Sequence, residues 1–207
     1  MSNKPISDIS EYYNEKFSLH GPTPHGVDWN GLSSQFERFT QLCKVLGAKK
    51  NFSINDFGCG YGALYEFLIQ SGYKNFQYNG NDISPLMIQN AQKRFEGLND
   101  VSFVESSKPQ QISDFSIASG VMNVKLNEKD VNWKIEVQKI LNLLNKYSKS
   151  GFSFNCLTSY SDQEKMKDYL YYADPLQMFH YCKLEFSQNI ALLHDYNLYE
   201  FSILVKK

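Results

Sequence analysis

The sequence predicts an α/β protein whose doubly wound, mostly parallel sheet ends in an antiparallel hairpin. Short strand-like runs alternate with helical patterns between positions 51 and 157, which is typical of parallel strands joined by right-handed crossover helices. The last two strand candidates are separated only by "DYNL". Because a parallel connection needs about a dozen residues or more, these two strands are expected to pair antiparallel.

Apolar spacing and start or stop signals define each expected element. Residues 6–17 predict a short helix, and a second helix carries apolar residues at helical spacing from Leu32 to Leu46, where Gly47 is a stop signal. Ser84 as N-cap and Pro85 at the first helical position mark a later helix start. Strands are expected at 51–56, 76–83, 101–105, 115–119, 151–157, 189–194 and 199–205, and further helices at 64–70, 85–95, 131–147, 164–170 and 175–186.

The bulk properties describe an ordinary globular protein. The 207 residues contain no repeat or linker, which predicts one domain over 1–207, with a helical N-terminal segment at 1–48 before a core at 49–207. No apolar run reaches the ~20 residues of a membrane span, and the polar start lacks a signal peptide's apolar core, so a cytoplasmic location is expected. Four cysteines without C-x-x-C spacing predict reduced thiols and no metal site, and a net charge of −1 argues against a nucleic-acid partner.

A glycine-rich turn in "NDFGCGYGAL" follows the first strand and offers two readings. Gly58, Gly60 and Ala63 fit a dinucleotide fingerprint, whereas Gly58, Gly60 and Gly62 behind Asp56 fit a loop for a sulfonium nucleoside. A tight turn with no ligand is the third interpretation. An acid beside a pyrophosphate is unfavourable, whereas a carboxylate helps to bind the amino group of S-adenosylmethionine, so Asp56 favours the second reading.

The second strand also ends in an acid. Asp82 lies 20 residues after Gly62, the position from which a carboxylate reaches ribose hydroxyls. This feature indicates a nucleoside and does not discriminate between the two cofactors.

The segments "INDFGCGYGAL" and "YNGNDISPLMIQNAQKRF" resemble the first two motifs of class I S-adenosylmethionine-dependent methyltransferases, and the terminal hairpin supports the resemblance independently. It covers 51–207. It implies a Rossmann-like, seven-stranded sheet in the order 3-2-1-4-5-7-6, with S-adenosylmethionine as cofactor, S-adenosylhomocysteine as product and a small molecule as substrate.

The same resemblance implies cofactor contacts along the carboxyl edge of the sheet. Asp56 would lie near the methionine amino group, the three glycines beneath the cofactor, and Asp82 at the ribose. An acid often follows the third strand in this family, and either Glu105 or Ser106 in "VESSKP" would replace it. The remaining expected contacts are Ile83 at the adenine and Ser119, Gly120 and Val121 beside the sulfonium.

Methyl transfer is an in-line displacement, for which a general base helps when the acceptor is a hydroxyl. His194 in "ALLHDYN", with Asp195 beside it, is the candidate base. The alternative is that His194 caps a strand and bonds a carbonyl. O-methylation of a small polar molecule is favoured because the chain lacks the N-P-P-Y and D-P-P-Y motifs that nucleic-acid and protein amino methyltransferases often show, and also the Pro-Cys nucleophile of cytosine C5 enzymes.

The segment before the sheet is expected to fold over the cofactor as a lid, with Tyr12 and Tyr13 forming an aromatic wall around the sulfonium. An ordered surface loop is the alternative. Candidate substrate contacts are His20, Trp29, Asn123, Asn155 and Tyr160. Two other functions stay open at this point, an NAD-dependent oxidoreductase and a non-catalytic S-adenosylmethionine-binding partner subunit, and the sequence predicts no oligomeric state.

Overall fold

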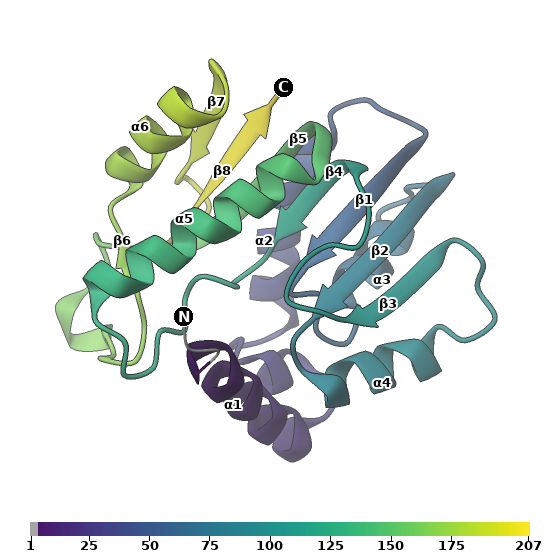
Figure 1. Ribbon diagram of the computed structural model, residues 1–207, viewed down its shortest axis with the longest axis horizontal. Helices are drawn as coiled ribbons and strands as arrows, with labels where there is room; N and C mark the ends of the chain where they lie inside the picture. The colour runs from purple at the N-terminus through teal and green to yellow at the C-terminus, as the bar shows by residue number, and fades with distance from the viewer. Residues whose placement is uncertain (1–3) are drawn as a thin grey trace.

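The computed structural model describes residues 4–207, whose strands form one eight-stranded sheet with helices on both faces (Figure 1). The helices are α1 Lys4–His20, α2 Leu32–Cys43, α3 Ala63–Gln70, α4 Pro85–Arg94, α5 Asp130–Lys146 and α6 Pro175–Glu185. The strands are β1 Phe52–Phe57, β2 Phe76–Asp82, β3 Val101–Glu105, β4 Ser113–Ala118, β5 Ser148–Thr158, β6 Tyr172–Ala173, β7 Asn189–Leu193 and β8 Glu200–Lys206.

The strand order confirms the predicted topology. The sheet runs β3-β2-β1-β4-β5-β8-β7, which is the expected order 3-2-1-4-5-7-6 once the short β6 is set aside. Strands β1 to β5 pair in parallel, and β8 pairs antiparallel with both β5 and β7, as the short turn before it predicts. The carboxyl ends of β1, β2 and β4 therefore meet at one edge of the sheet.

The segment 164–170 is not the predicted helix. It holds a 3-10 turn at Gln163–Lys165, and β6 then pairs in parallel with β5 as the eighth strand. Its local backbone bonds are only of the i→i−3 kind, such as Leu170 N–H to the Lys167 carbonyl at 3.0 Å, and others go to the loop after β4. The N–H groups of Lys125 and Leu126 both donate to the Tyr169 carbonyl at 3.0 Å, and the Tyr171 N–H donates to the Asn123 carbonyl at 2.7 Å.

Two hydrophobic cores lie on the two faces of the sheet. One core includes Leu42 of α2 and Leu64 of α3, and the other includes Leu141 of α5 and Cys182 of α6. Figure 1 shows α5 in front of the sheet and α2 and α3 behind it. All four cysteines are buried. Ser84 caps α4 as predicted, since the Met87 N–H donates to its Oγ at 3.2 Å.

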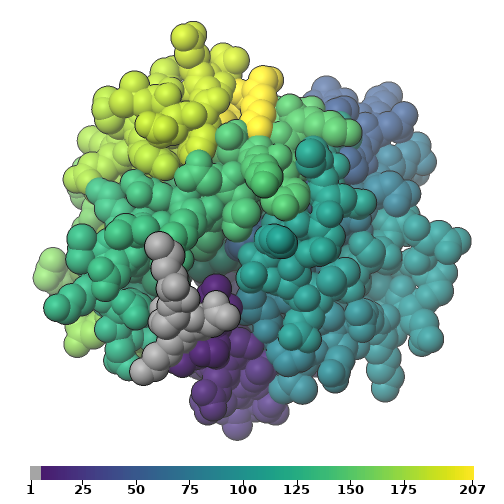
Figure 2. Space-filling model, viewed as in Figure 1, coloured from purple at the N-terminus to yellow at the C-terminus, as the bar shows by residue number. Residues whose placement is uncertain are grey.

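Helix α1 is longer than expected and lies beyond the carboxyl ends of the parallel strands (Figure 1). In the space-filling view its purple surface meets the teal surface around α4 (Figure 2). The chain then passes through a 3-10 turn at Pro24–Val27 into α2. Between residues 4 and 207, no helix has both the length and the apolar character required to cross a bilayer.

Candidate functional site

The turn after β1 packs directly against the loop after β4. Gly58 has a φ of 74°, a left-handed conformation that favours glycine. A Cβ atom there would lie 2.5 Å from Cγ2 of Val121. Only a residue without a side chain permits this approach, so Gly58 and Val121, two of the predicted cofactor contacts, lie side by side.

The Asp82 carboxylate is held by backbone donors at the end of β2. The Gly60 N–H donates to Oδ2 at 2.8 Å, and the Ser84 N–H donates to Oδ1 at 2.9 Å. Burial raises the pKa of Asp82, while these donors and the Ile83 N–H act in the opposite direction. A carboxylate offers about four lone-pair sites, so these backbone donors do not use all of them and capacity remains for a ribose hydroxyl.

Asp56 lies deeper than Asp82, beneath the glycine turn. It is 3% exposed, and the Tyr78 hydroxyl donates to its carboxyl group. Burial raises the pKa of Asp56 to about 7, with a further rise from Asp82 and an opposing effect of the Tyr78 hydrogen bond. The carboxyl therefore keeps its proton to a higher pH than an ordinary aspartic acid, and its contact with a methionine amino group stays a prediction.

The loop after β4 is fixed through the backbone of Gly120. Its N–H donates to Oδ1 of Asn155 at 2.8 Å, and its φ is 75°. A Cβ at Gly120 would lie 2.3 Å from Cζ2 of Trp29, so the indole rests on this glycine. Ser119 Oγ, one residue earlier, is buried with no hydrogen-bond partner among the described residues. The loop thus presents an unsatisfied hydroxyl beside a backbone that Trp29 covers.

Helix α1 is hydrogen-bonded to the end of β2. Ser10 Oγ donates to the Ile83 carbonyl at 2.8 Å, and Ser84 Oγ donates to Oδ1 of Asn14 at 2.6 Å. Burial raises the pKa of the Tyr13 hydroxyl, and the charges of Asp28 and Asp82 add to this rise. The structure therefore brings Tyr13 and Ile83 to the same edge as Asp82.

A second cluster joins α1 to the turn that precedes α2. The Tyr12 hydroxyl donates to Oδ2 of Asp28 at 2.7 Å, and Lys16 Nζ donates to Oδ1 at 2.8 Å. Asp28 has a φ of 60°, and its neighbour Trp29 reaches Gly120. The Tyr169 ring lies 6.2 Å from the Tyr12 ring. These contacts join two tyrosines, a carboxylate and an ammonium group to the turn that carries Trp29.

The sequence of the described chain has recognisable relatives. Residues 54–146 match the family model described as "Methyltransferase domain". Rv1506c of Mycobacterium tuberculosis, which is named as a methyltransferase, is 49% identical over 164 residues that make up 79% of this chain and 98% of that protein. This chain belongs to the S-adenosylmethionine-dependent methyltransferases. The family assignment decides against the NAD-dependent oxidoreductase.

Solved structures share the fold of this methyltransferase. The N-methyltransferase NodS from Bradyrhizobium japonicum WM9, in complex with S-adenosylhomocysteine, gives a TM-score of 0.66 at 13% identity over 96% of this chain and 97% of its own. Magnesium protoporphyrin IX methyltransferase from Synechocystis PCC 6803, also with S-adenosylhomocysteine bound, gives a TM-score of 0.65 at 13% identity over 98% of this chain and 99% of its own. The cofactor of the methyltransferase is S-adenosylmethionine, and the product is S-adenosylhomocysteine.

The residues of the methyltransferase fit this cofactor along the carboxyl edge. S-adenosylmethionine supplies an electrophilic methyl group when bound. Asp82 has lone pairs for the ribose, and the buried Ser119 hydroxyl lacks a partner that a ligand would supply. Ser106 anchors the next loop, since its N–H donates to the Asp82 carbonyl at 2.8 Å, while its Oγ bonds Lys108. Glu105 is exposed.

His194 lies away from this cluster, directly after the outermost strand β7. Leu193 of β7 and Asn155 of β5 both pair with Ser202 of β8, so the three residues lie at the same level of the sheet. Strand β7 is three strands away from β4, and at ~4.8 Å between neighbouring strands this is a separation of ~14 Å. The His194 ring is 6.1 Å from Tyr160 and 6.2 Å from Phe201. His194, Asp195 and Tyr160 are exposed, so they form a separate group at the same edge of the sheet.

Three predicted substrate contacts are placed differently from expectation. Asn155 is fully buried, and its amide groups bond Gly120 and Glu200, so it supports the site from below. Asn123 is 5% exposed, and its Oδ1 accepts the Leu157 N–H at 3.1 Å. His20, at the end of α1, is exposed and lies 5.9 Å from the His25 ring. Buried asparagines at strand ends satisfy backbone groups before they meet ligands.

Three residues of the site were not singled out from the sequence: Tyr78, Arg38 and Glu200. Arg38 and Glu200 form a buried ion pair of 2.7 Å. A charged residue at the start of the apolar strand "EFSILV" was the available signal, because a buried charge requires a partner. Tyr78 carries no comparable signal, since tyrosines in strands are common.

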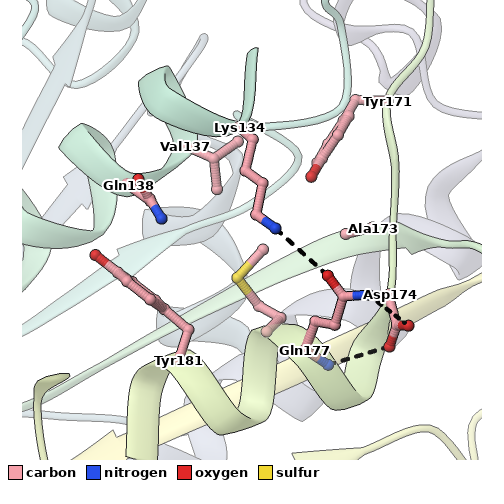
Figure 3. A pocket seen from close by; sticks show the side chains of 9 residues that line it. Lys134, Val137, Gln138, Tyr171, Ala173, Asp174, Gln177 and Tyr181 are labelled. Atoms are coloured by element: carbon pink, nitrogen blue, oxygen red, sulfur yellow. Dashed lines mark hydrogen bonds between the residues drawn. The ribbon is translucent and has the colours of Figure 1, made fainter. Parts of the chain in front are cut away.

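A separate cavity of about 140 Å³ lies between α5, β6 and α6, on the face covered by α5 (Figure 3). Val137, Met178 and Ala173 form its apolar lining. Lys134 Nζ donates to Oε1 of Gln177 at 3.4 Å across it. This cavity shares no lining residue with the glycine turn.

Proposed function

We propose that the methyltransferase transfers the methyl group of S-adenosylmethionine to a hydroxyl oxygen of a small polar molecule. The observation that carries this proposal is the cover over the carboxyl edge: α1 bonds the end of β2, and Trp29 rests on Gly120. In this proposal the segment before β1 acts as a lid over the core that begins at residue 49, within one domain. A covered site excludes water and suits a small acceptor.

The charge distribution supports a small acceptor over a nucleic acid. The net charge of the chain is −1, and of its 21 basic residues only two are arginines, both in ion pairs, Arg38 with Glu200 and Arg94 with Glu66. Phosphate backbones are bound by clusters of unpaired basic side chains. Beside Trp29 the site offers tyrosines and the Lys16–Asp28 ion pair, which match a polar acceptor with aromatic or hydroxyl groups.

The hydroxyl proton of the acceptor has two candidate bases. The first candidate base is His194, with Asp195 beside it. Because His194 lies after the edge strand β7, this base requires an acceptor that extends from β4 toward β7. Asp28 is the second, favoured by its position next to Trp29 and by the two donors that hold its carboxylate. Both residues can be replaced with little risk to the fold: His194 is exposed, and asparagine tolerates the left-handed conformation of Asp28.

Calorimetric titration with S-adenosylhomocysteine and NAD, followed by labelled methyl transfer to a library of hydroxyl, carboxyl and amine metabolites, tests the proposal. We expect binding of the homocysteine nucleoside alone and transfer to a hydroxyl. Transfer only to amines would contradict O-methylation. Binding without any transfer, with activity restored by a second protein, would indicate the non-catalytic partner subunit.

The two bases are separated by His194→Ala and Asp28→Asn, assayed over a range of pH. Loss of the true base is expected to lower kcat by about 10²-fold to 10⁴-fold and to leave the affinity for S-adenosylhomocysteine within threefold of the wild-type value. His180→Ala, at an exposed histidine of α6, is the matched control for His194→Ala, and Glu15→Gln, at an exposed carboxylate of α1, is the matched control for Asp28→Asn. Equal, small effects of both variants would indicate that positioning alone suffices.

A further inference from the structure

A closed ring of contacts joins α2, β8, β5 and the loop after β4. Arg38 Nε donates to both carboxylate oxygens of Glu200, at 3.0 and 2.9 Å, and its Nη2 donates to Oε1 at 2.7 Å. Asn155 Nδ2 donates to Oε2 of the same carboxylate. Asn155 Oδ1 accepts the Gly120 N–H at 2.8 Å.

Trp29 closes this ring from the N-terminal side. The Arg38 guanidinium carbon lies 3.8 Å from the centroid of the Trp29 ring, within cation–π distance. The same indole also lies against Gly120, where a Cβ atom would come within 2.3 Å of Cζ2 of Trp29. One guanidinium group therefore fixes both Trp29 and, through Glu200 and Asn155, the backbone that Trp29 covers.

The ion pair in this ring is poorly explained by stability alone. The Arg38 and Glu200 side chains are 8% and 1% exposed. Removing two charges from water costs several kcal/mol each, and replacing such a pair by apolar residues of similar volume is often neutral or stabilising. The remaining use of the pair is to impose one geometry on its neighbours.

The chemistry of the carboxylate determines that geometry. An ionised Glu200 only accepts hydrogen bonds, so the Asn155 amide must turn its NH₂ group toward Glu200. Its oxygen then faces Gly120 and accepts the N–H. A glutamine at position 200 would donate as well as accept, and the Asn155 amide could then turn over and present NH₂ to the Gly120 N–H.

We propose that Arg38 and Glu200 are positioning residues of methyl transfer, which set the Gly120 backbone on the cofactor side and the Trp29 indole on the acceptor side in one arrangement. This inference rests on the proposed function, because that function places the sulfonium beside Gly120 and the acceptor under the N-terminal segment. Neither residue contacts a reacting atom. Their effect on the reaction passes through Asn155 and Trp29.

Glu200→Gln tests the inference, with Glu66→Gln as the matched control. The Arg94–Glu66 pair has the same 2.7 Å separation, but its side chains are 29% and 41% exposed. In enzyme bound to S-adenosylhomocysteine, hydrogen exchange at the Gly120 amide should be at least tenfold faster in Glu200→Gln and unchanged in Glu66→Gln. With an acceptor found in the library, kcat should fall by about 10-fold to 100-fold with KM within threefold, as for a small misplacement of reacting groups.

Trp29→Ala is the second variant, and it serves if Glu200→Gln does not fold. It leaves the buried hydrogen bonds in place, so kcat should fall while Gly120 exchange stays within threefold of wild type. Unchanged Gly120 exchange in Glu200→Gln, unchanged kcat in either variant, or a parallel loss of S-adenosylhomocysteine affinity would overturn the inference. Absence of transfer by the wild-type enzyme would instead overturn the proposed function, and the exchange comparison would still decide the positioning role.

Discussion

Asp56 is expected to make the stability of the methyltransferase fall as the pH rises, and Asp56→Asn should remove this fall. Burial raises the pKa of Asp56 from its ordinary 3.8 to about 7. The unfolded chain therefore loses this proton near pH 4, whereas the folded chain keeps it to about pH 7. Between these values the folded state binds more protons, so raising the pH favours unfolding.

The size of the effect follows from the pKa change. Between the two pKa values, the free energy of unfolding falls by about 1.4 kcal/mol for each pH unit. About two of these pH units lie between pH 5 and the folded pKa, so the free energy of unfolding falls by at most ~3 kcal/mol between pH 5 and pH 8. Asparagine keeps an acceptor for the Tyr78 hydroxyl and cannot ionise. The free energy of unfolding, measured with urea at pH 5, 6, 7 and 8, should therefore decline ~3 kcal/mol less in Asp56→Asn than in the wild type.

Tyr78→Phe sharpens this test. The Tyr78 hydrogen bond lowers the pKa of Asp56, so its removal should extend the loss of stability to higher pH. Parallel curves for wild type and Asp56→Asn would refute the reasoning, because they would mean that Asp56 titrates in the folded protein as it does in the unfolded chain.

Three further predictions concern the cofactor edge. If the cationic amino group of S-adenosylhomocysteine lies near Asp56, it lowers the pKa of this carboxyl, so binding at pH 7 should release a fraction of a proton; titration in buffers of different ionisation enthalpy measures it, and no release would place the amino group elsewhere. Asp82→Asn should weaken S-adenosylhomocysteine binding about 10-fold to 100-fold by calorimetry, since hydrogen bonds to charged groups contribute ~1.5–3 kcal/mol, and an unchanged affinity would remove Asp82 from the ribose site. Gly120→Ala should lower the free energy of unfolding by ~1–3 kcal/mol, because its Cβ would meet Trp29 at a φ of 75°, and Trp29→Ala in the same chain should recover part of this loss.

Local signals in the sequence predict the part of the site that local interactions build. The glycine turn, Asp82 and the Ser84 cap each depend on residues within one strand-to-helix connection. The helix expected at 164–170 is wrong because its backbone groups bond the loop at 123–126, which no local pattern reveals. The Arg38–Glu200 pair joins residues 162 positions apart, so the sequence indicates a buried charge without its partner.

For Asn155 the sequence predicts the position but not the role. Its place at the carboxyl end of the fifth strand predicts proximity to the site, which the bond to Gly120 supports. Its role depends on Glu200 from a different strand, because that carboxylate decides which end of the amide faces the loop. Strand ends thus predict which residues gather, whereas hydrogen-bond partners across the sheet decide what each one does.

The burial of all four cysteines gives this protein a practical advantage for spectroscopy. Burial raises the pKa of each thiol, for Cys182 to about 12, and maleimide reagents react with thiolates. Leu19 near the end of α1 and Leu184 in α6 are 77% and 68% exposed. A Leu19→Cys, Leu184→Cys double variant would therefore label selectively, and the distance between the two dyes would report any movement of α1 when S-adenosylhomocysteine binds.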